Sequence, residues 1–291
     1  MTTPTRFQAS ESGGLSTDMT NAWERDGFLI LENFATPEQC RALLDRAVTL
    51  IEGFEPGEAP SVFSTTSTTH ARDDYFRQSG DKIRFFLEEE AEPDGPFGSV
   101  NKIGHALHDL DPVFDAFSRS RRLAAVARDL DVAAPLLLQS MVIGKPPRIG
   151  GEVTCHQDST FLFTEPESCV GFWFALEDAT LENGCLWAIP SAHRGPLKSR
   201  FRERDGVLVT EALDASPWPM DRKLPLEAPA GSLIILHGRL PHLSEANRSA
   251  KSRLAYTLHL IDGATRFAED NWLRRAPDMP LRGFGDLTEA E

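Results

Sequence analysis

Cysteine is scarce in this chain, and the few cysteines form no recognisable set. There are four, with no C-x-x-C pair among them: Cys40, Cys155, Cys169 and Cys185. A disulfide framework or a thiolate zinc site needs cysteines that are paired or clustered at short spacing. We therefore expect reduced thiols in a cytoplasmic protein.

Long apolar runs and targeting signals are also missing. No run reaches the length of about eighteen apolar residues that suggests a membrane-spanning helix. Residues 1–17 lack the basic and apolar regions of a secretory signal, and the final residues form no peroxisomal address. The sequence predicts no membrane association, and we expect residues 1–17 to form a disordered tail.

Positive charge is in the minority. Lysine and arginine number 30 against 44 aspartates and glutamates, which gives a net charge of −14 at pH 7. Nucleic acids and anionic membranes are bound by basic surfaces, so neither is an expected partner, and a small molecule is. Arg72, Arg77 and Arg84 could still form a local basic patch.

The remaining composition fits one folded domain without internal repeats. We assign residues 18–291 to it, with a helical flank over 18–134, a β-rich core over 135–262 and a C-terminal tail over 263–291. The sequence gives no indication of the oligomeric state.

The flank carries clear helix signals. A short helix is expected over 18–26, followed by a strand over 28–31. Thr36 followed by Pro37 and Gln39 is typical of a helix start with a capping box, and Asp111-Pro112 begins another helix. Apolar residues at helical spacing are expected to face the core: Leu43, Leu44, Ala47, Val48, Ile51, Phe114, Phe117, Leu123 and Val126.

From Pro135 the pattern changes to short strands separated by Gly and Pro turns. The strands expected here cover residues 136–143, 152–156, 169–176, 184–189, 231–237 and 253–261, and one further strand is expected earlier, over 82–87. This arrangement favours a mainly β fold with flanking helices, a double-stranded β-helix of the jelly-roll or cupin-like type. Residues 53–80 form an expected loop and 195–228 a proline-rich insert, and each could act as a lid.

His156 and Asp158 stand two residues apart within Gly150–Thr160. Side chains at i and i+2 of a strand share one face, so an imidazole and a carboxylate would point the same way. An H-x-D pair alone is also compatible with a buried histidine bonded to a carboxylate. The pair becomes informative only together with further residues.

A second histidine later in the chain would complete a metal site. His242 follows an apolar strand, and two histidines with one carboxylate suit a non-haem Fe(II) oxygenase because they leave open positions on the metal. His237 competes with His242 for this role. The context Pro241-His242 with Ser244 favours His242.

Arg253 lies eleven residues after His242. Its planar guanidinium matches a carboxylate, as the distal end of a chelating 2-oxo acid would require, and Ser244 could add a hydroxyl. The alternative is a surface arginine on an edge strand.

This ordered set, H-x-D, a distant His and Arg eleven residues later, resembles the phytanoyl-CoA dioxygenase family of Fe(II)/2-oxoglutarate dioxygenases. The flanks are similar to its domain-containing proteins over roughly residues 22 to 273. They are Ser79–Phe86, Asn101–His108, Gly150–Val153 and Glu177–Trp187.

The resemblance implies that His156, Asp158 and His242 bind Fe(II) and that Arg253, with Ser244, binds the 5-carboxylate of 2-oxoglutarate. O2 is then the co-substrate, with ascorbate as a supporting reductant, and succinate, CO2 and a hydroxylated small organic product are formed. Related halogenases carry a small residue where Asp158 stands, so its presence favours hydroxylation.

The resemblance also places further residues around the co-substrate or substrate. Lys102, Gln139, Met141 and Trp173 would line the co-substrate pocket, and His105 and His108 could touch the substrate. His193 is expected to be structural, and His70 and His259 carry no signal. For the four residues assigned to the co-substrate pocket, the alternative is an ordinary core or surface role.

Two other functions stay open. One is a non-catalytic module that binds iron and 2-oxoglutarate, and the other is a cupin-like isomerase or hydrolase, which would have no use for Arg253. The sequence does not identify the primary substrate, because fold alone does not determine it.

Overall fold

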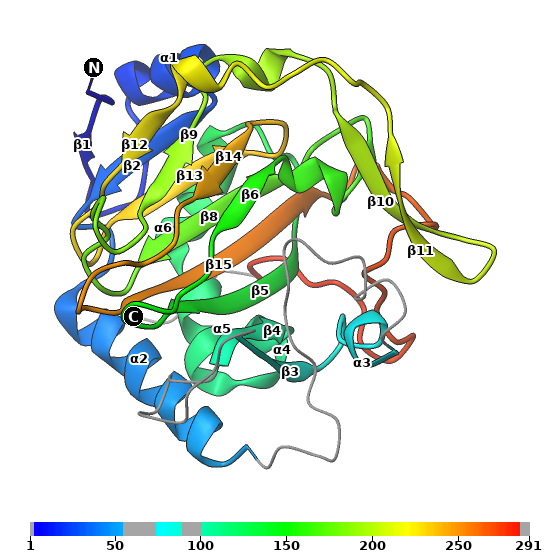
Figure 1. Ribbon diagram of the computed structural model, residues 1–291, viewed down its shortest axis with the longest axis horizontal. Coiled ribbons are helices and arrows are strands. Elements are labelled where there is room, and N and C mark those ends of the chain that lie inside the picture. The colour runs from blue at the N-terminus through cyan, green and yellow to red at the C-terminus, as the bar shows by residue number, and fades with distance from the viewer. Residues whose placement is uncertain (1–2, 55–73, 89–99, 286–291) are drawn as a thin grey trace.

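The computed structural model describes residues 3–54, 74–88 and 100–285 (Figure 1). The helices are α1 (Thr17–Asp26), α2 (Pro37–Glu52), α3 (Asp74–Arg77), α4 (Leu107–Leu110), α5 (Pro112–Ser118) and α6 (Arg121–Asp129), with 3-10 turns η2 (Asp158–Thr160), η3 (Ala192–Arg194) and η4 (Met220–Arg222). The strands are β1 (Phe7–Gln8), β2 (Phe28–Glu32), β3 (Ile83–Leu87), β4 (Val100–His105), β5 (Pro135–Lys145), β6 (Val153–His156), β7 (Thr164–Glu165), β8 (Val170–Ala175), β9 (Leu186–Ala188), β10 (Ser199–Arg204), β11 (Val207–Ala212), β12 (Leu224–Leu226), β13 (Leu233–His237), β14 (His242–Ser244), β15 (Arg253–Asp262) and β16 (Arg266–Phe267).

Two main sheets form the core of the molecule. The major sheet has eight strands in the order β1-β2-β13-β8-β15-β5-β4-β3, and the minor sheet has four in the order β12-β9-β14-β6. All pairings within them are antiparallel except that of β1 with β2. The predicted jelly roll, mainly β with flanking helices, is confirmed.

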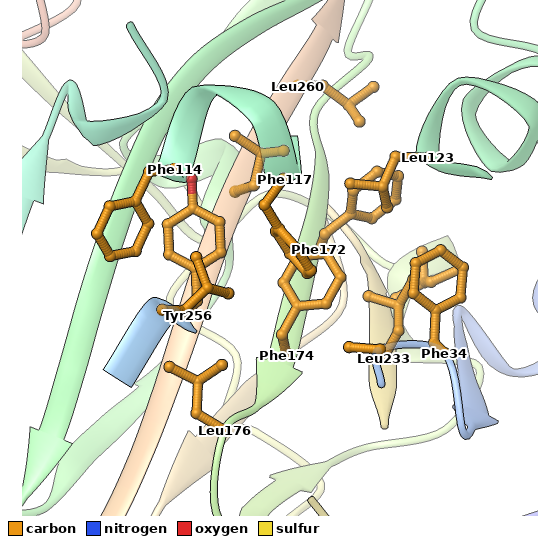
Figure 2. Packing of buried hydrophobic residues seen from close by; sticks show 14 of the residues in the cluster. Phe34, Phe114, Phe117, Leu123, Phe172, Phe174, Leu176, Leu233, Tyr256 and Leu260 are labelled. Atoms are coloured by element: carbon orange, nitrogen blue, oxygen red, sulfur yellow. The ribbon is translucent and has the colours of Figure 1, made fainter. Parts of the chain in front are cut away.

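Alternate residues of the major sheet face the helices. Phe172, Phe174 and Tyr256 point outward from β8 and β15 and pack with Phe114 and Phe117 of α5 (Figure 2). Because side chains of a strand alternate between faces, the intervening residues of β8 and β15 turn toward the minor sheet. The helices therefore cover the outer face and leave the inner face for the site.

The inner face between the sheets has its own apolar cluster. Trp173, Ala175 and Ala255 of the major sheet pack with Leu186 and Ala188 of the minor sheet. This cluster fixes the spacing of the two sheets at one end of the inner face.

Local signals explain the helix starts. The Thr36 hydroxyl accepts from the Gln39 backbone N–H, and the Gln39 side chain accepts from the Thr36 N–H, which is the predicted capping box. Asp111 caps α5 by accepting from the N–H groups of Val113 and Phe114.

The N-terminal segment differs from the expected disordered tail over 1–17. Phe7 of β1 pairs with Leu31 of β2, and the Arg6 guanidinium lies 3.1 Å from Glu32 Oε1. Such a short parallel pairing has no periodicity that a sequence could show.

The insert over 195–228 is more regular than expected. It forms the hairpin of β10 and β11, which projects from one side of the molecule (Figure 1), and then adds β12 to the minor sheet. Asp205 and Gly206 both have positive φ angles (53° and 77°), as a two-residue hairpin turn requires. The Asp-Gly dipeptide is the local sequence signal for this turn.

The C-terminal segment after residue 262 also packs against the rest of the chain. The rings of Trp272 and Phe76 stack with centroids 4.5 Å apart. Most of the predicted 53–80 loop, including His70 and Arg72, lies outside the described residues. The division into flank, core and tail stays a prediction. Among the described helices, none is long and apolar enough to cross a membrane.

Candidate metal centre

His156 and Asp158 meet at a transition between two backbone conformations. β6 ends at His156, Gln157 is extended (φ −120°, ψ 134°), and Asp158 begins the 3-10 turn η2. The prediction that both residues share one face is reproduced, but the strand does not continue through Asp158. The Ser159 N–H donates to the Gly238 carbonyl at 2.9 Å, which draws the turn toward the chain before His242.

The buried side chain of Gln157 holds this transition in place. Its Nε2 donates to the carbonyls of Arg239 at 2.8 Å and Pro196 at 3.2 Å, while its Oε1 accepts from the Lys198 N–H at 2.9 Å. Gln157 therefore connects the H-x-D segment to two other parts of the chain.

His242 joins the pair through strand pairing in the minor sheet. It lies opposite His156 in the register of β14 and β6, with the ring centroids 4.3 Å apart. Asp158 Oδ1 lies 3.7 Å from Nε2 of each histidine. One ligand atom from each residue falls within 4.8 Å of the others, so the three residues could hold a metal ion.

Backbone carbonyls orient both imidazoles. His156 Nδ1 lies 2.8 Å from the Thr154 carbonyl, and His242 Nδ1 lies 3.0 Å from the Leu240 carbonyl. Because a carbonyl only accepts, Nδ1 carries the proton and the Nε2 lone pair faces Asp158, the arrangement usual for metal-binding histidines.

The ionisation of this group suits a divalent metal. Burial, aided by His242, lowers the pKa of His156 to about 4, so it is neutral at neutral pH. Burial alone would raise the pKa of Asp158, but the neighbouring histidines, led by His242, lower it below its usual value. Nitrogen and carboxylate ligands bind at about 2.0–2.2 Å, so two ligands of one ion lie at most about 4.4 Å apart, and the two 3.7 Å separations fit.

A fourth polar residue, His259, adjoins the group and carried no signal in the sequence. Its Nε2 lies 3.4 Å from Asp158 Oδ2. His259 is on β15 of the major sheet, whereas His156 and His242 belong to the minor sheet. Contact between sheets depends on their packing, so no spacing in the sequence marks it.

Arg253 is buried on the central strand β15, between β5 and β8, so it is not an edge-strand surface residue. Burial lowers the pKa of Arg253 to about 10, and it stays charged at neutral pH. Its Nε and Nη1 are buried without an acceptor among the described residues. Its guanidinium lies 5.6 Å from the centroid of the Trp173 ring. In the part of the chain that the structure describes, these two nitrogens have no acceptor, and the carboxylate of a ligand would supply one.

The other residues assigned by resemblance share this inner face or adjoin it. Gln139 pairs with His259 in the register, and Met141 pairs with Thr257, which also pairs with Trp173. Lys102 pairs with Ile143 of the same face, and burial lowers the pKa of Lys102 to about 7. Ser244 is buried two residues beyond His242. Their roles stay predictions.

His237, the alternative to His242 as a metal ligand, does not belong to the His156–Asp158–His242 group. Its ring lies 5.7 Å from that of Trp23 and 5.0 Å from that of His193, and its Nδ1 accepts from the Arg239 N–H. His193 packs on this side as well, beside Gly27, where a Cβ atom would lie 2.4 Å from His193 Nδ1.

His105 and His108 are buried and already bonded. His105 Nδ1 lies 2.8 Å from the Ser79 hydroxyl, and its ring stands edge-on to that of Trp272 at 5.1 Å. His108 Nδ1 lies 2.7 Å from the Ser140 hydroxyl. Their predicted contact with a substrate stays a prediction.

Comparison with known proteins shows clear relatives. The phytanoyl-CoA dioxygenase (PhyH) family model matches residues 23–255. A phytanoyl-CoA dioxygenase of Arabidopsis thaliana is 42% identical over 272 residues, 91% of this chain and 95% of that protein. The phytanoyl-CoA dioxygenase domain-containing protein 1 of Bos taurus is 42% identical over 283 residues, 92% and 97% of the two chains.

Solved structures share the fold at lower identity. SnoK, a non-heme alpha-ketoglutarate-dependent carbocyclase from nogalamycin biosynthesis, superposes with a TM-score of 0.63 at 20% identity, covering 94% of this chain and 96% of SnoK. EctD from S. alaskensis, solved with 2-oxoglutarate and 5-hydroxyectoine, gives a TM-score of 0.62 at 19% identity, covering 94% and 88%.

Proposed function

Because the chain belongs to the phytanoyl-CoA dioxygenase family, we propose that it is an Fe(II)- and 2-oxoglutarate-dependent dioxygenase that hydroxylates a small organic molecule. The observation that carries this proposal is the pairing of two buried features. One is the His156–Asp158–His242 group, and the other is the Arg253 guanidinium, whose Nε and Nη1 have no acceptor among the described residues.

The metal role falls to His156, Asp158 and His242. Two imidazoles and one carboxylate form the ligand set of non-haem iron oxygenases, which leaves open positions for a co-substrate and O2. With iron bound, the site supplies oxidative chemistry in which 2-oxoglutarate and O2 become succinate and CO2 while one oxygen atom enters a C–H bond. The retained Asp158 favours hydroxylation over halogenation.

Arg253 is the group we assign to the distal carboxylate of 2-oxoglutarate. Two guanidinium N–H groups can donate to the two oxygens of one carboxylate, which fixes both charge and orientation. The Trp173 ring lies beside this cation and would exclude water from the ion pair. Ser244 would add a hydroxyl to the same carboxylate.

Lys102, Gln139 and Met141 would orient the co-substrate from the neighbouring strands. Lys102 and Met141 lie on β4 and β5, which are adjacent in the major sheet, and Gln139 shares a face of β5 with Met141. Their contribution is positioning, since a small displacement of a bound reactant lowers the rate strongly.

Succinate formation from 2-oxoglutarate tests the proposal. The purified protein is supplied with Fe(II), ascorbate and O2, first alone and then with a panel of small organic substrates. We expect slow succinate release that the His156→Ala and Arg253→Ala variants lose, while the His237→Asn variant retains it. His237→Asn is the matched control, because it removes a half-buried histidine outside the site and keeps an acceptor for the Arg239 N–H.

Two outcomes would contradict the proposal. Absence of 2-oxoglutarate binding in the metal-loaded wild type would contradict the whole site assignment. Binding that requires Arg253, without succinate for any added substrate, would favour a non-catalytic iron and 2-oxoglutarate binding module.

A further inference from the structure

The two carboxylate oxygens of Asp158 face different partners. Oδ1 lies 3.7 Å from the Nε2 atoms of His156 and His242. Oδ2 points toward the major sheet, where His259 Nε2 lies 3.4 Å away. Among the described residues, Oδ2 makes no hydrogen bond of regular geometry, so its contact with His259 is a close approach of two polar groups. The carboxylate is thus divided between the group that could hold a metal and a histidine outside it.

Gly171 makes this contact possible. It pairs with His259 in the register of β8 and β15, so it stands beside the histidine on the inner face. A Cβ atom at this position would lie 2.9 Å from Asp158 Oδ2 and 3.4 Å from His259 Nε2. Any side chain here would press on the carboxylate oxygen, so the missing side chain provides the space in which the two groups meet.

The chemistry of the pair fixes the direction of the contact. A carboxylate oxygen only accepts hydrogen bonds, so in a hydrogen bond between the two groups His259 Nε2 would be the donor. His259 Nδ1 is buried without a partner among the described residues. Nε2 is therefore the nitrogen through which His259 acts on a neighbour, and that neighbour is Asp158.

We propose that His259 is a positioning residue that holds Oδ2 of Asp158, so that this carboxylate binds the metal through Oδ1 alone. This inference rests on the proposed metal role of Asp158. A carboxylate that binds through both oxygens would occupy one more position on the metal. Holding Oδ2 away keeps that position open for the co-substrate or O2.

Metal affinity tests the inference without relying on turnover. Mn(II), a redox-stable stand-in for Fe(II), is titrated into metal-free protein by calorimetry. His259→Gln places an amide nitrogen near the position of Nε2, whereas His259→Asn places it near Nδ1. Both side chains are polar and smaller than histidine, so they form a matched pair that differs in the position of the donor.

We expect His259→Asn to raise the Kd for Mn(II) about 10- to 100-fold, the usual effect of losing a group that supports a metal ligand. His259→Gln should stay within a few-fold of the wild type. Thermal unfolding of the metal-free variants checks that both are folded. If His259→Asn does not fold, Gly171→Ala replaces it, since the added Cβ displaces Oδ2 while His259 remains.

The outcomes separate this inference from the proposed function. Wild-type protein that binds Mn(II), with His259→Asn binding equally well, would overturn the positioning role and leave the metal site intact. Equal losses in His259→Asn and His259→Gln would overturn it as well, because the position of the donor would then be irrelevant. Wild-type protein that binds no Mn(II) would contradict the proposed function itself.

Discussion

His156 and His242 face each other across the antiparallel pair of β6 and β14, and each directs Nε2 to the same oxygen of Asp158 at 3.7 Å. The backbone determines the placement of both imidazole rings. Strand register brings the rings together, and the carbonyls of Thr154 and Leu240 set their orientation. The fold itself therefore holds the two imidazoles and the carboxylate close together.

Replacing Arg253 should weaken 2-oxoglutarate binding to the Mn(II)-loaded protein. Hydrogen bonds to charged groups contribute about 1.5–3 kcal/mol, so Arg253→Ala should raise the Kd about 10- to 100-fold or more. Arg253→Lys keeps the charge but loses the planar fork, and its loss should be intermediate. Calorimetry measures both, with Arg266→Lys as a control on an exposed ion pair. Unchanged affinity in Arg253→Ala would refute the assignment.

Adding one methyl group at Gly171 should impair the metal site. In Gly171→Ala the new Cβ would stand 2.9 Å from Asp158 Oδ2, closer than carbon and oxygen normally approach. The carboxylate must shift, and we expect a Kd for Mn(II) at least several-fold higher. Gly14→Ala is the control, because its Cβ would meet only ordinary contacts at 3.5 Å. Equal Mn(II) affinities in the two variants would count against the prediction.

Gln157→Ala should destabilise the fold as well as the site. The substitution leaves the Pro196 and Arg239 carbonyls and the Lys198 N–H without their partner. An unsatisfied buried polar group costs about 1–3 kcal/mol, so the free energy of unfolding should fall by at least that amount. Urea unfolding of the metal-free protein measures the fall. Gln8→Ala, which loses two exposed hydrogen bonds, to Glu32 and from Asn33, should change it by less than about 0.5 kcal/mol.

His237 should make the metal-free protein less stable as the pH falls. Burial, with His193 and Arg239 nearby, lowers the pKa of His237 in the folded protein from 6.5 to about 4. Between these values the unfolded chain binds the proton more strongly, so the free energy of unfolding decreases as pH drops from about 6.5 toward 4. Urea unfolding at several pH values should show a shallower decrease for His237→Asn. Parallel curves for wild type and variant would show that His237 does not contribute.

The sequence predicted those parts of the site that depend on local spacing. His156 and Asp158 are two residues apart, and His242 and Arg253 follow in a fixed order, so a pattern can reveal them. His259 could not be found this way, because its contact with Asp158 crosses from one sheet to the other through the gap at Gly171.

For the fold as well, the sequence predicted the elements that depend on neighbouring residues and missed a pairing between distant segments. The capping box at Thr36 and the alternating strands were readable from neighbouring residues. The pairing of β1 with β2 was not, since two residues carry no periodicity. The β10–β11 hairpin had a local signal in Asp205-Gly206, which the many prolines of the segment obscured.

The two carboxylate oxygens of Asp158 face different sheets, and this has a consequence for stability. An ion held by His156, Asp158 and His242 would be anchored in the minor sheet and, through Oδ2 and His259, braced against the major one. Such an ion would link the two sheets. Because a ligand that binds only the folded state raises the free energy of unfolding, the ion would stabilise the fold. Iron supply would then govern how long the folded chain survives, in addition to whether it can turn over.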